Sequence, residues 1–422
     1  MYFRDFVKKL EENGLLTRIK REVSTEYEIS TLMRMLDGRA LLFEKVRGYD
    51  MPVVANVCST REMISLGMGI KKEEITKKIT HAIDNPSKPA MGKGEDIEEA
   101  LPDLSKIPIL KYYPQDGGPY IASAIVVAEL SDPGTNVSYH RMMVIDKDRI
   151  ALRILPRHFD EFIKRGLNRF AICIGAPVQV LVAGAISAEF GKSELDIANT
   201  LEPYELVDID GFKVPKSEIV MIASFTGEMH EEGPFVDLTQ TKDIERKQRV
   251  AKIEKIFMRK GALYHALLPG GLEHKELMGM PKEPTIFREV NRVCECKDVY
   301  ITPGGCSWLH GVVSIKKKSA DDGIKAIEAA FQGHKSMKHV FIVDEDIDVH
   351  DPSEVEWAMA TRFQDGLVIK RKQTGSSLDP SADPETRETT KIGFDFTRPL
   401  DKPEEAFKKV ELPLKLNLED YL

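Results

Sequence analysis

The residues best suited to chemistry lie in the segment EEGPFVD (231–237), where acidic side chains flank a Gly-Pro pair. Gly233 can adopt backbone angles that a side chain would forbid, and Pro234 fixes its own, so the chain is expected to bend here. The bend lets Glu232 and Asp237 face one cavity, although their odd spacing would separate them on a straight strand. One of two carboxylates in a desolvated pocket is expected to hold a proton near neutral pH, which predicts an acid/base site. The alternative is a solvated acidic turn.

A second group of polar residues occupies the segment 136–141, with the sequence NVSYHR. Asn136 and Arg141 would face opposite ways on a regular strand, so either Asn136 stands at the start of the strand or a bulge re-aims it. Arg141 precedes apolar residues, and a buried guanidinium needs an anion. Glu232 or a substrate carboxylate would serve, the latter through bidentate geometry. The alternative is a partly exposed arginine on an edge strand.

Two further candidates each stand where a loop enters a predicted helix. His158 follows the sequence ILPR, and Glu194 lies in GKSELDIA. With Asn136 they offer an amide oxygen, an imidazole nitrogen and a carboxylate, a fairly hard set that suits Mn²⁺ or Mg²⁺ better than zinc. The alternative is that both are ordinary surface residues, and the spacing alone does not join the three.

Composition limits the function classes. The chain has 422 residues, 42% of them hydrophobic and 30% charged, which is typical of a globular protein with two or three domains. A formal net charge of −8 without a long basic block argues against a nucleic-acid-binding or membrane-surface protein. No run of eighteen apolar residues occurs, and the N-terminal segment is an amphipathic helix and not a signal peptide, so we expect a cytoplasmic protein. Five scattered cysteines fit a reducing compartment.

The elements that position these residues change in character along the chain. Helical stripes end at Gly14 and Gly38 and alternate with the strand-like runs LLTRIKREV, ALLFEKV and MPVVANV, which indicates a small α/β lobe over 1–85. Frequent prolines between 86 and 119 indicate an extended connector on the surface.

From Tyr120 the pattern is typical of an antiparallel sheet or barrel of about 150 residues. Its expected strands include IASAIVVAEL, VSYHRMMVI, FAICIG, VQVLVAGAI and FKVPKSEIVMIASFTGEM. The later segment PGGLEHKELMG is expected to be a loop. From Val293 strands and helices alternate as in an α/β layer, with an N-cap at Asp351 before Pro352.

Several standard motifs are absent from the sequence. It contains no G-x-G-x-x-G after a strand, no G-x-x-x-x-G-K-[ST], no H-E-x-x-H and no G-x-S-x-G. The common nucleotide-binding and hydrolase motifs therefore do not explain this chain.

The ordered motifs together resemble one family. Asn136 with Arg141, PRH ending at His158, GKSE ending at Glu194 and the EGPFxD pattern from Glu232 resemble, in order and interval, the UbiD family of prenylated-FMN-dependent decarboxylases. The C-terminal segments VDEDIDVHDPSEVEWAMATR and TTKIGFDFTRP are similar to the same family, so the resemblance covers most of the chain.

The resemblance implies a site. Family members bind prenylated FMN, whose phosphate is held through Mn²⁺ and often K⁺. The metal ligands would be Asn136, His158 and Glu194, and the catalytic network would be Glu232, Arg141 and Asp237. The residues implied to contact the cofactor are Ser138, Tyr139, His140, Arg141, Arg157, His158 and Lys391. Two departures from the family pattern are His140 beside the arginine and Val236 before the acid.

The resemblance also implies an α+β fold with three parts. These are an N-terminal α/β lobe with its Pro-rich connector over 1–119, a split β-barrel cofactor domain with a linker helix over 120–292, and a C-terminal α/β oligomerisation domain with a tail over 293–422. Homodimers or homohexamers are expected, with a prenyl-FMN synthase as supplier of the cofactor. No nucleic-acid or membrane partner is expected.

The implied reaction is non-oxidative decarboxylation of an α,β-unsaturated or aromatic acid. Arg141 would orient the carboxylate, the cofactor would act as electron sink, Asp237 would protonate the remaining carbon and Glu232 would hold Arg141. Chain length and composition are similar to the archaeal branch that acts on trans-anhydromevalonate 5-phosphate. Its second phosphate would need a basic residue, for which Arg153, Arg157 and Lys192 are candidates.

Three other functions remain open. The first is decarboxylation of a polyprenylated 4-hydroxybenzoate in the quinone pathway, which would need a long apolar channel. The second is a flavin- or metal-binding scaffold without activity, although a scaffold has no need of a buried acid pair. The third is a metal-dependent hydrolase without flavin, which only the Asn, His and Glu set favours.

Overall fold

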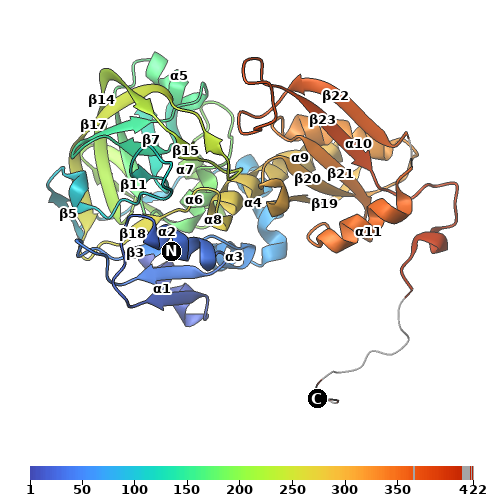
Figure 1. The fold of residues 1–422 in the computed structure, drawn as a ribbon, viewed down its shortest axis with the longest axis horizontal. Helices are drawn as coiled ribbons and strands as arrows, with labels where there is room; N and C mark the ends of the chain where they lie inside the picture. Colours follow the sequence, from blue (N-terminus) through green and yellow to red (C-terminus); the bar gives the residue numbers. More distant parts are fainter. Residues whose placement is uncertain (365, 411–418, 420, 422) are drawn as a thin grey trace. The chain divides into compact units, whose positions relative to one another are not determined.

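The computed structural model describes residues 1–364, 366–410, 419 and 421. The chain has a mixed α/β fold, as expected, and divides into two compact units (Figure 1). The first unit comprises Met1–Thr285, Ile301–Leu309 and Ser377–Ser381, and the second comprises Ile286–Tyr300, His310–Ser376 and Ala382–Leu422. The predicted N-terminal lobe and nearly all of the predicted barrel domain thus lie in the first unit.

A four-stranded sheet begins the first unit, in the order β1-β2-β3-β18. Strands β1 and β2 pair in parallel, β2 and β3 antiparallel, and β3 and β18 in parallel. The apolar stripe predicted for the first helix is its buried face, formed by Phe3, Phe6 and Leu10. The elements of this region are α1 (Phe3–Glu12), β1 (Leu16–Ile19), α2 (Glu28–Met35), β2 (Ala40–Phe43), β3 (Val53–Ala55), α3 (Arg61–Met68), α4 (Ile75–Asp84) and β18 (Tyr264–Ala266).

The Pro-rich connector is only partly a surface segment. It contains β4 (Ala90–Met91), β5 (Ile97–Ala100) and the 3₁₀ turn η2 (Leu104–Lys106). Its second half is buried in the core of the first unit through Leu104, Ile107, Ile109, Leu110 and Tyr112. The prediction of a connector laid over the surface is therefore wrong for this half, because its apolar residues alternate with the prolines and enter the core.

The central sheet has nine strands, in the order β6-β9-β10-β17-β14-β11-β7-β8 with β5 paired to β17. All of its pairings are antiparallel. The two longest strands, β14 and β17, pair with register shifts after Ile222 and Phe225. Its strands are β6 (Tyr120–Ile121), β7 (Ile125–Leu130), β8 (Gly134–Tyr139), β9 (Met142–Val144), β10 (Arg149–Leu152), β11 (Arg169–Ile174), β14 (Ile219–Glu232) and β17 (Arg246–Arg259).

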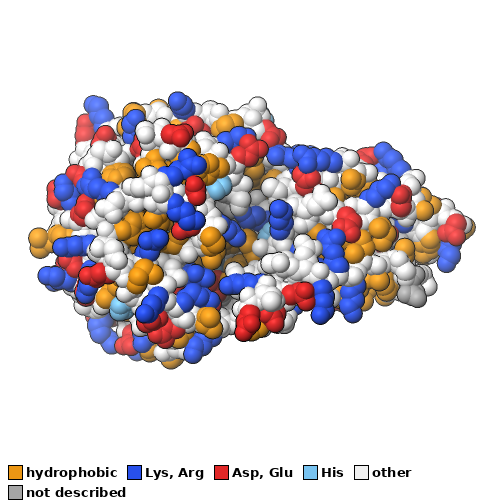
Figure 2. All heavy atoms as spheres, turned by 90° about the horizontal axis from the view of Figure 1, so that it is seen from above, with side chains coloured by type: hydrophobic (Ala, Val, Ile, Leu, Met, Phe, Trp, Pro, Cys, Tyr) orange, Lys and Arg blue, Asp and Glu red, His pale blue; other side chains and the backbone are white. Residues whose placement is uncertain are grey.

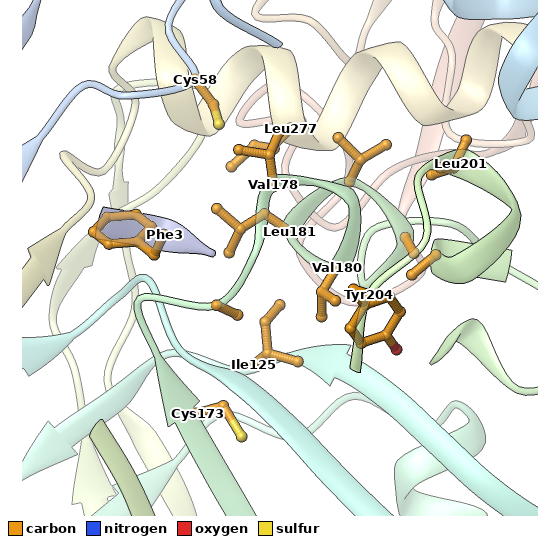
Figure 3. Packing of buried hydrophobic residues seen from close by; sticks show 14 of the residues in the cluster. Phe3, Cys58, Ile125, Cys173, Val178, Val180, Leu181, Leu201, Tyr204 and Leu277 are labelled. Atoms are coloured by element: carbon orange, nitrogen blue, oxygen red, sulfur yellow. The ribbon is translucent and has the colours of Figure 1, made fainter. Parts of the chain in front are cut away.

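The segment predicted as the strand VQVLVAGAI contains a helix, α6 (Val178–Ala183). All six of its residues are buried, and Figure 3 shows Val178, Val180 and Leu181 packed among side chains from other elements. A helix that is buried on every face is apolar at nearly every position, here at all except Gln179, so it shows no helical period and resembles a buried strand.

Helices and small sheets complete the first unit. The segment PGGLEHKELMG, expected to be a loop, contains α8 (Leu272–Gly279), and its glycines lie before and at the end of the helix. Strands β13, β12 and β4 form one small sheet, and β15 and β16 form another. The remaining elements are α5 (His158–Lys164), α7 (Glu194–Leu201), β12 (Glu205–Ile209), β13 (Phe212–Pro215), β15 (Phe235–Val236), β16 (Lys242–Asp243), η3 (Met280–Lys282) and η4 (Pro303–Gly305). Helix α9 (Glu283–Asn291) begins in the first unit, and most of its residues belong to the second.

The second unit contains the predicted alternation of strands and helices. Its sheet has the order β19-β20-β21-β23-β22, and α10 packs on β20, β21 and β23. The predicted N-cap is confirmed, since the Asp351 side chain accepts from the Ser353 amide with Pro352 at the first helical position. Its elements are β19 (Glu295–Ile301), β20 (His310–Lys316), α10 (Asp322–Gly333), β21 (His339–Asp344), α11 (Pro352–Arg362), β22 (Val368–Thr374), β23 (Glu388–Asp395) and η5 (Glu404–Phe407).

Two properties concern the molecule as a whole. No helix among the described residues has both the length and the apolar character needed to cross a membrane. On the face drawn in Figure 2, acidic and basic side chains are interspersed among hydrophobic ones.

Candidate active site

The acidic segment bends where the sequence predicts. Strand β14 ends at Glu232, Gly233 has a φ of +106°, and the chain returns as β15, which pairs with β16. The connector supports the bend, because the Gly117 amide donates to the Pro234 carbonyl at 2.9 Å. A Cβ atom on Gly117 would overlap the carbonyl oxygen of Gly233, so only glycine allows this approach.

Both acids of the bent segment bind the guanidinium of Arg141. Its Nε and NH2 groups donate to the two oxygens of Glu232 at 2.8 and 3.0 Å. Its NH1 group donates to Asp237 Oδ2 at 2.8 Å. Arg141 therefore bridges the two carboxylates, and the side chain of Glu232 is fully buried whereas that of Asp237 is 20% exposed.

Aromatic residues enclose the buried end of this network. The Tyr120 hydroxyl donates to Glu232 Oε1 at 3.1 Å, and burial together with the Glu232 charge raises the pKa of Tyr120. The Arg141 guanidinium lies 4.5 Å from the ring centre of Phe235, a cation–π contact. Burial opposes the charge of Arg141, but its carboxylate partners outweigh this and raise its pKa. The guanidinium is thus fixed and charged before any ligand binds.

Sequence reasoning missed a third carboxylate. Asp243 Oδ2 accepts from Arg141 NH2 at 2.9 Å, and Arg246 binds both oxygens of Asp243 at 2.7 and 2.8 Å. Burial alone would raise the pKa of Asp243, but the hydrogen bond from Arg246 and the charge of Arg141 lower it to about 2. The only sequence signal is the spacing of Asp243 and Arg246 on either side of a turn, which is common on protein surfaces.

The odd spacing of Asn136 and Arg141 has an explanation that the sequence did not suggest. Asn136 lies inside β8, opposite Ala128, and not at its start. Strand β8 ends at Tyr139 and β9 begins at Met142, so His140 and Arg141 occupy the break between two strands. The break turns Arg141 toward the acids, and no bulge in the β7–β8 pair is involved.

The other residues near this break have different surroundings. The ring centres of His140 and Phe159 lie 4.6 Å apart. The Nδ1 atom of His140 lies 3.1 Å from the Arg153 carbonyl oxygen, and its Nε2 atom lies 3.0 Å from Ser138 Oγ. Burial lowers the pKa of His140 to about 4, so the ring is neutral at neutral pH. The Tyr139 hydroxyl donates to the Leu181 carbonyl at 2.9 Å.

The three predicted metal ligands lie on elements that meet. Asn136 is on β8, and both α5, which begins at His158, and α7, which begins at Glu194, pack against β8. Asn136 and Glu194 are buried, and Glu194 Oε2 accepts from the Val137 amide at 2.8 Å. Burial raises the pKa of Glu194 to about 8. The Glu194 carboxyl group is thus desolvated, and no cationic side chain of the described residues forms an ion pair with it.

The donor set fits a divalent cation. Burial, and secondarily the charge of Arg157, lowers the pKa of His158, so its imidazole is neutral as a metal ligand must be. A buried carboxylate without a counter-charge is costly, and a metal ion would supply that charge. Among the described residues no group of three or more His, Cys, Asp or Glu side chains is placed to hold a metal, and this trio includes only two such residues and an amide.

A second residue missed from the sequence is Lys282, in η3. Its buried ammonium donates to the Ala185 carbonyl at 2.9 Å and to Ser187 Oγ at 2.6 Å, both in the segment between α6 and α7. Burial, and secondarily the charge of Arg157, lowers the pKa of Lys282 to about 7. A buried amine beside a second cation suits a phosphate group, and the carbonyl and hydroxyl that it contacts also suit a monovalent cation.

Lys391 lies on β23 in the second unit. Its buried ammonium donates to the Lys335 carbonyl and lies 5.3 Å from the ring centre of Phe331. Burial, and secondarily the charge of Arg371, lowers the pKa of Lys391 to about 8.

The sequence matches three family models that together span most of the chain. They are the N-terminal domain, the Rift-related domain and the C-terminal domain of 3-octaprenyl-4-hydroxybenzoate carboxy-lyase, at residues 7–83, 85–272 and 275–396. Anhydromevalonate phosphate decarboxylase of Methanothermobacter thermautotrophicus is 41% identical over 96% of this chain and 99% of its own. The Methanocaldococcus jannaschii protein of that name is 39% identical over the same shares.

Solved structures give the same assignment. The UbiD-class enzyme HmfF from Pelotomaculum thermopropionicum, in complex with FMN, superposes with a TM-score of 0.95 at 36% identity over the whole of both chains. An evolved dimeric form of HmfF in complex with prFMN superposes with a TM-score of 0.91 at 33% identity over the same shares. From these matches and the ordered site residues, the chain belongs to the UbiD family.

Proposed function

We propose that this protein decarboxylates trans-anhydromevalonate 5-phosphate to isopentenyl phosphate with prenylated FMN. The observation that carries the proposal is Arg141 held between Glu232 and Asp237, in a chain that aligns over 96% of its length with two anhydromevalonate phosphate decarboxylases. The reaction removes CO₂ and places one proton on the carbon that carried it, so the site needs a cation for the carboxylate and an acid for the carbon.

The chain offers residues to hold the cofactor and its metal. Asn136, His158 and Glu194 would hold Mn²⁺ or Mg²⁺. Lys282 and Arg157 would hold the flavin phosphate, with a K⁺ ion as a further ligand of that group. Other residues proposed to contact the cofactor are Ser138, Tyr139 and His140. When bound, prenylated FMN supplies the electron sink for loss of CO₂.

Arg141 has one donor that no described residue engages and that is available to the substrate. A guanidinium has five N–H groups, and four of them are engaged by Glu232, Asp237 and Asp243. The remaining N–H, on NH1, is beside the bond to Asp237. A substrate carboxylate that binds there lies next to the acid that must later protonate its carbon.

The two acids have different roles because they differ in access to solvent. Asp237 is partly exposed, and among the described residues its Oδ1 accepts only from the Leu238 amide, so this carboxyl group is accessible and can deliver a proton to the substrate carbon. Glu232 is fully buried and bound by Arg141 and Tyr120, so it holds the guanidinium in place. Asp237 is therefore the proton donor and Glu232 a positioning residue.

The assembly follows from the same relationship. We propose a homo-oligomer, because the related HmfF exists in a dimeric form. A prenyl-FMN synthase would supply the cofactor.

The direct experiment measures CO₂ release by protein that was produced with a prenyl-FMN synthase, with the flavin spectrum recorded first. We expect release from trans-anhydromevalonate 5-phosphate and none from protein loaded with plain FMN. Release only from 4-hydroxybenzoates or another aromatic acid would replace the proposed substrate. A flavin-free preparation under these conditions would contradict the proposed cofactor.

A further inference from the structure

Arg153 lies beside Arg141 on the same face of the central sheet. Its amide donates to the Arg141 carbonyl at 3.1 Å, which continues the β9–β10 register by one residue beyond the Leu152–Met142 pair. Residues that face each other across an antiparallel pair point to the same side. The side chain of Arg153 therefore points toward the side on which Arg141 meets its acids.

The neighbouring strand places Arg246 on this face as well. The β10–β17 register, which pairs Leu152 with Arg249, brings Arg153 opposite Gln248, and the Gln248 side chain accepts from the Ile154 amide at 3.1 Å. Arg246 is two residues from Gln248 and so shares its face. Gln248 is buried and Arg246 half-buried, whereas Arg249 is exposed, so this is the inner face.

The carboxylates near Arg153 form ion pairs with Arg141 and Arg246. Asp243 binds Arg141 and Arg246, while Glu232 and Asp237 bind Arg141. Within the described part of the chain, no carboxylate forms an ion pair or hydrogen bond with the Arg153 guanidinium. Burial, and then the charges of Arg246 and Arg141, lowers the pKa of Arg153, which nevertheless stays charged.

Lys192 and Arg157, the other two candidates for binding the substrate phosphate, have different surroundings from Arg153. Lys192 is exposed and forms an ion pair with Glu189 at 3.0 Å. Arg157 is exposed and lies near the buried Lys282, at the end proposed for the cofactor phosphate. Arg153 alone combines partial burial, a place beside Arg141 and a guanidinium without a carboxylate.

We propose that Arg153 binds the phosphate of the substrate while Arg141 binds its carboxylate. The inference rests on the proposed function and adds the residue that recognises the second anionic group. A guanidinium can bind two phosphate oxygens at once, and a phosphate dianion supplies the negative charge that this face lacks at Arg153. The spacing of the two arginines across one strand pair then selects acids that carry anions at both ends.

The test compares two substrates in the Arg153→Gln variant with loaded cofactor. A charge-assisted bond of about 1.5–3 kcal/mol corresponds to a factor of roughly 13–160, so we expect KM for the phosphorylated acid to rise on the order of 10–100-fold. The KM for trans-anhydromevalonate, which lacks the phosphate, should change by less than about threefold, because the lost bond does not exist for it. Arg249→Gln is the matched control, since it removes one arginine from the outer face of the neighbouring strand.

Three outcomes would overturn the inference. Unchanged KM for the phosphorylated acid means that Arg153 does not bind it. Equal losses for both acids mean that Arg153 acts on the carboxylate end. Loss of flavin from Arg153→Gln, measured by absorbance, means that the phosphate it binds belongs to the cofactor.

A measurement without turnover separates this inference from the proposed function. Inorganic phosphate, compared with chloride at equal ionic strength, should raise the Tm of flavin-loaded wild type and of Arg249→Gln but not of Arg153→Gln. If the wild type fails to decarboxylate the phosphorylated acid, the substrate proposal fails, and this shift alone decides whether Arg153 forms an anion site. An equal shift in all three proteins would contradict the site.

Discussion

Two regions of the first unit differ in whether their buried ionisable groups are paired with groups of opposite charge. Around Arg141, arginines and carboxylates bind one another, and Arg153 is the cation left over. In the second region, which comprises the start of α7 and the 3₁₀ turn η3, Glu194 and Lys282 are each buried without a partner of opposite charge among the described residues. The first region is preorganised by its own side chains, whereas the second depends on ligands to neutralise it.

The difference assigns tasks to the two regions. A network that is complete without ligands keeps its geometry through each turnover, which suits proton transfer and orientation of the substrate. Buried groups without a counter-charge raise the free energy of the protein when no ligand is bound. Binding of a metal ion or a phosphate removes this cost, which favours retention of a cofactor. Mutations in the two regions should therefore have opposite effects on stability.

The largest expected effect is that of Asp237→Asn in the first region. Loss of the proton donor should lower kcat on the order of 10²–10⁴-fold with cofactor content unchanged. The measurement is CO₂ release by protein with a verified prenyl-flavin spectrum. Glu231→Gln, a change at an exposed neighbour, is the control and should retain activity. Full activity of Asp237→Asn would remove this residue from the mechanism.

Next is Glu194→Gln in the second region. Removing the only anionic side chain of the proposed trio should weaken metal binding by at least about 10–100-fold, and flavin content should fall with it. Without metal the variant should unfold at the same temperature as the wild type or higher, because it buries no carboxylate. Metal analysis, absorbance and thermal unfolding measure these effects, with the exposed Glu189→Gln as control. A variant that keeps its metal would contradict the ligand assignment.

Lys282→Met should change how stability depends on pH. The pKa of Lys282 is about 7 in the folded protein and about 10.4 in an unfolded chain, so between these values the unfolded chain binds more protons. The free energy of unfolding then rises with pH across this window. The stability gained in this way is lost again as the pH falls toward 7. In the variant, the slope of the free energy of unfolding against pH should be smaller by up to about 1.4 kcal/mol per pH unit.

Denaturant unfolding of flavin-free protein between about pH 7 and 9 measures the slope. The exposed Lys247→Met is the control and should keep the wild-type slope. Identical slopes in Lys282→Met and the wild type would show that Lys282 stays charged in the folded protein.

The smallest effect is expected for Tyr120→Phe. It removes the hydroxyl that donates to Glu232 and should lower the free energy of unfolding by about 1–2 kcal/mol. Tyr264→Phe is a matched control, because that buried hydroxyl has no hydrogen-bond partner among the residues that the structure describes and its loss should cost nothing. Equal effects of the two changes would mean that Glu232 does not need Tyr120.

Much of the arrangement could be predicted from local sequence. The Gly-Pro pair after Glu232 specified the bend, and the loop-to-helix transitions at His158 and Glu194 specified where those helices begin. The strong alternation of the second unit gave its strands and helices. These features depend on backbone preferences within a few residues, so a single sequence contains them.

The remainder depends on contacts between distant segments. Helix α6 looked like a strand because tertiary packing, and not its own period, fixes its conformation. Asp243 and Lys282 carried no distinctive signal, because an acid near a turn and a lysine near a helix are ordinary on surfaces. Only the fold shows that one joins the Arg141 network and that the other is buried. The proposed roles of all these residues stay predictions.

The close backbone contact between Gly117 and Gly233 has a consequence for the evolution of such a protein. The connector and the acidic bend touch through bare backbone, so the distance between the two acids is set partly by a residue more than a hundred positions earlier. A side chain at position 117 would push the bend away while leaving every reacting group intact. Random mutagenesis should therefore recover folded, cofactor-bearing but inactive variants at this site, which inspection of the reacting groups alone would never nominate.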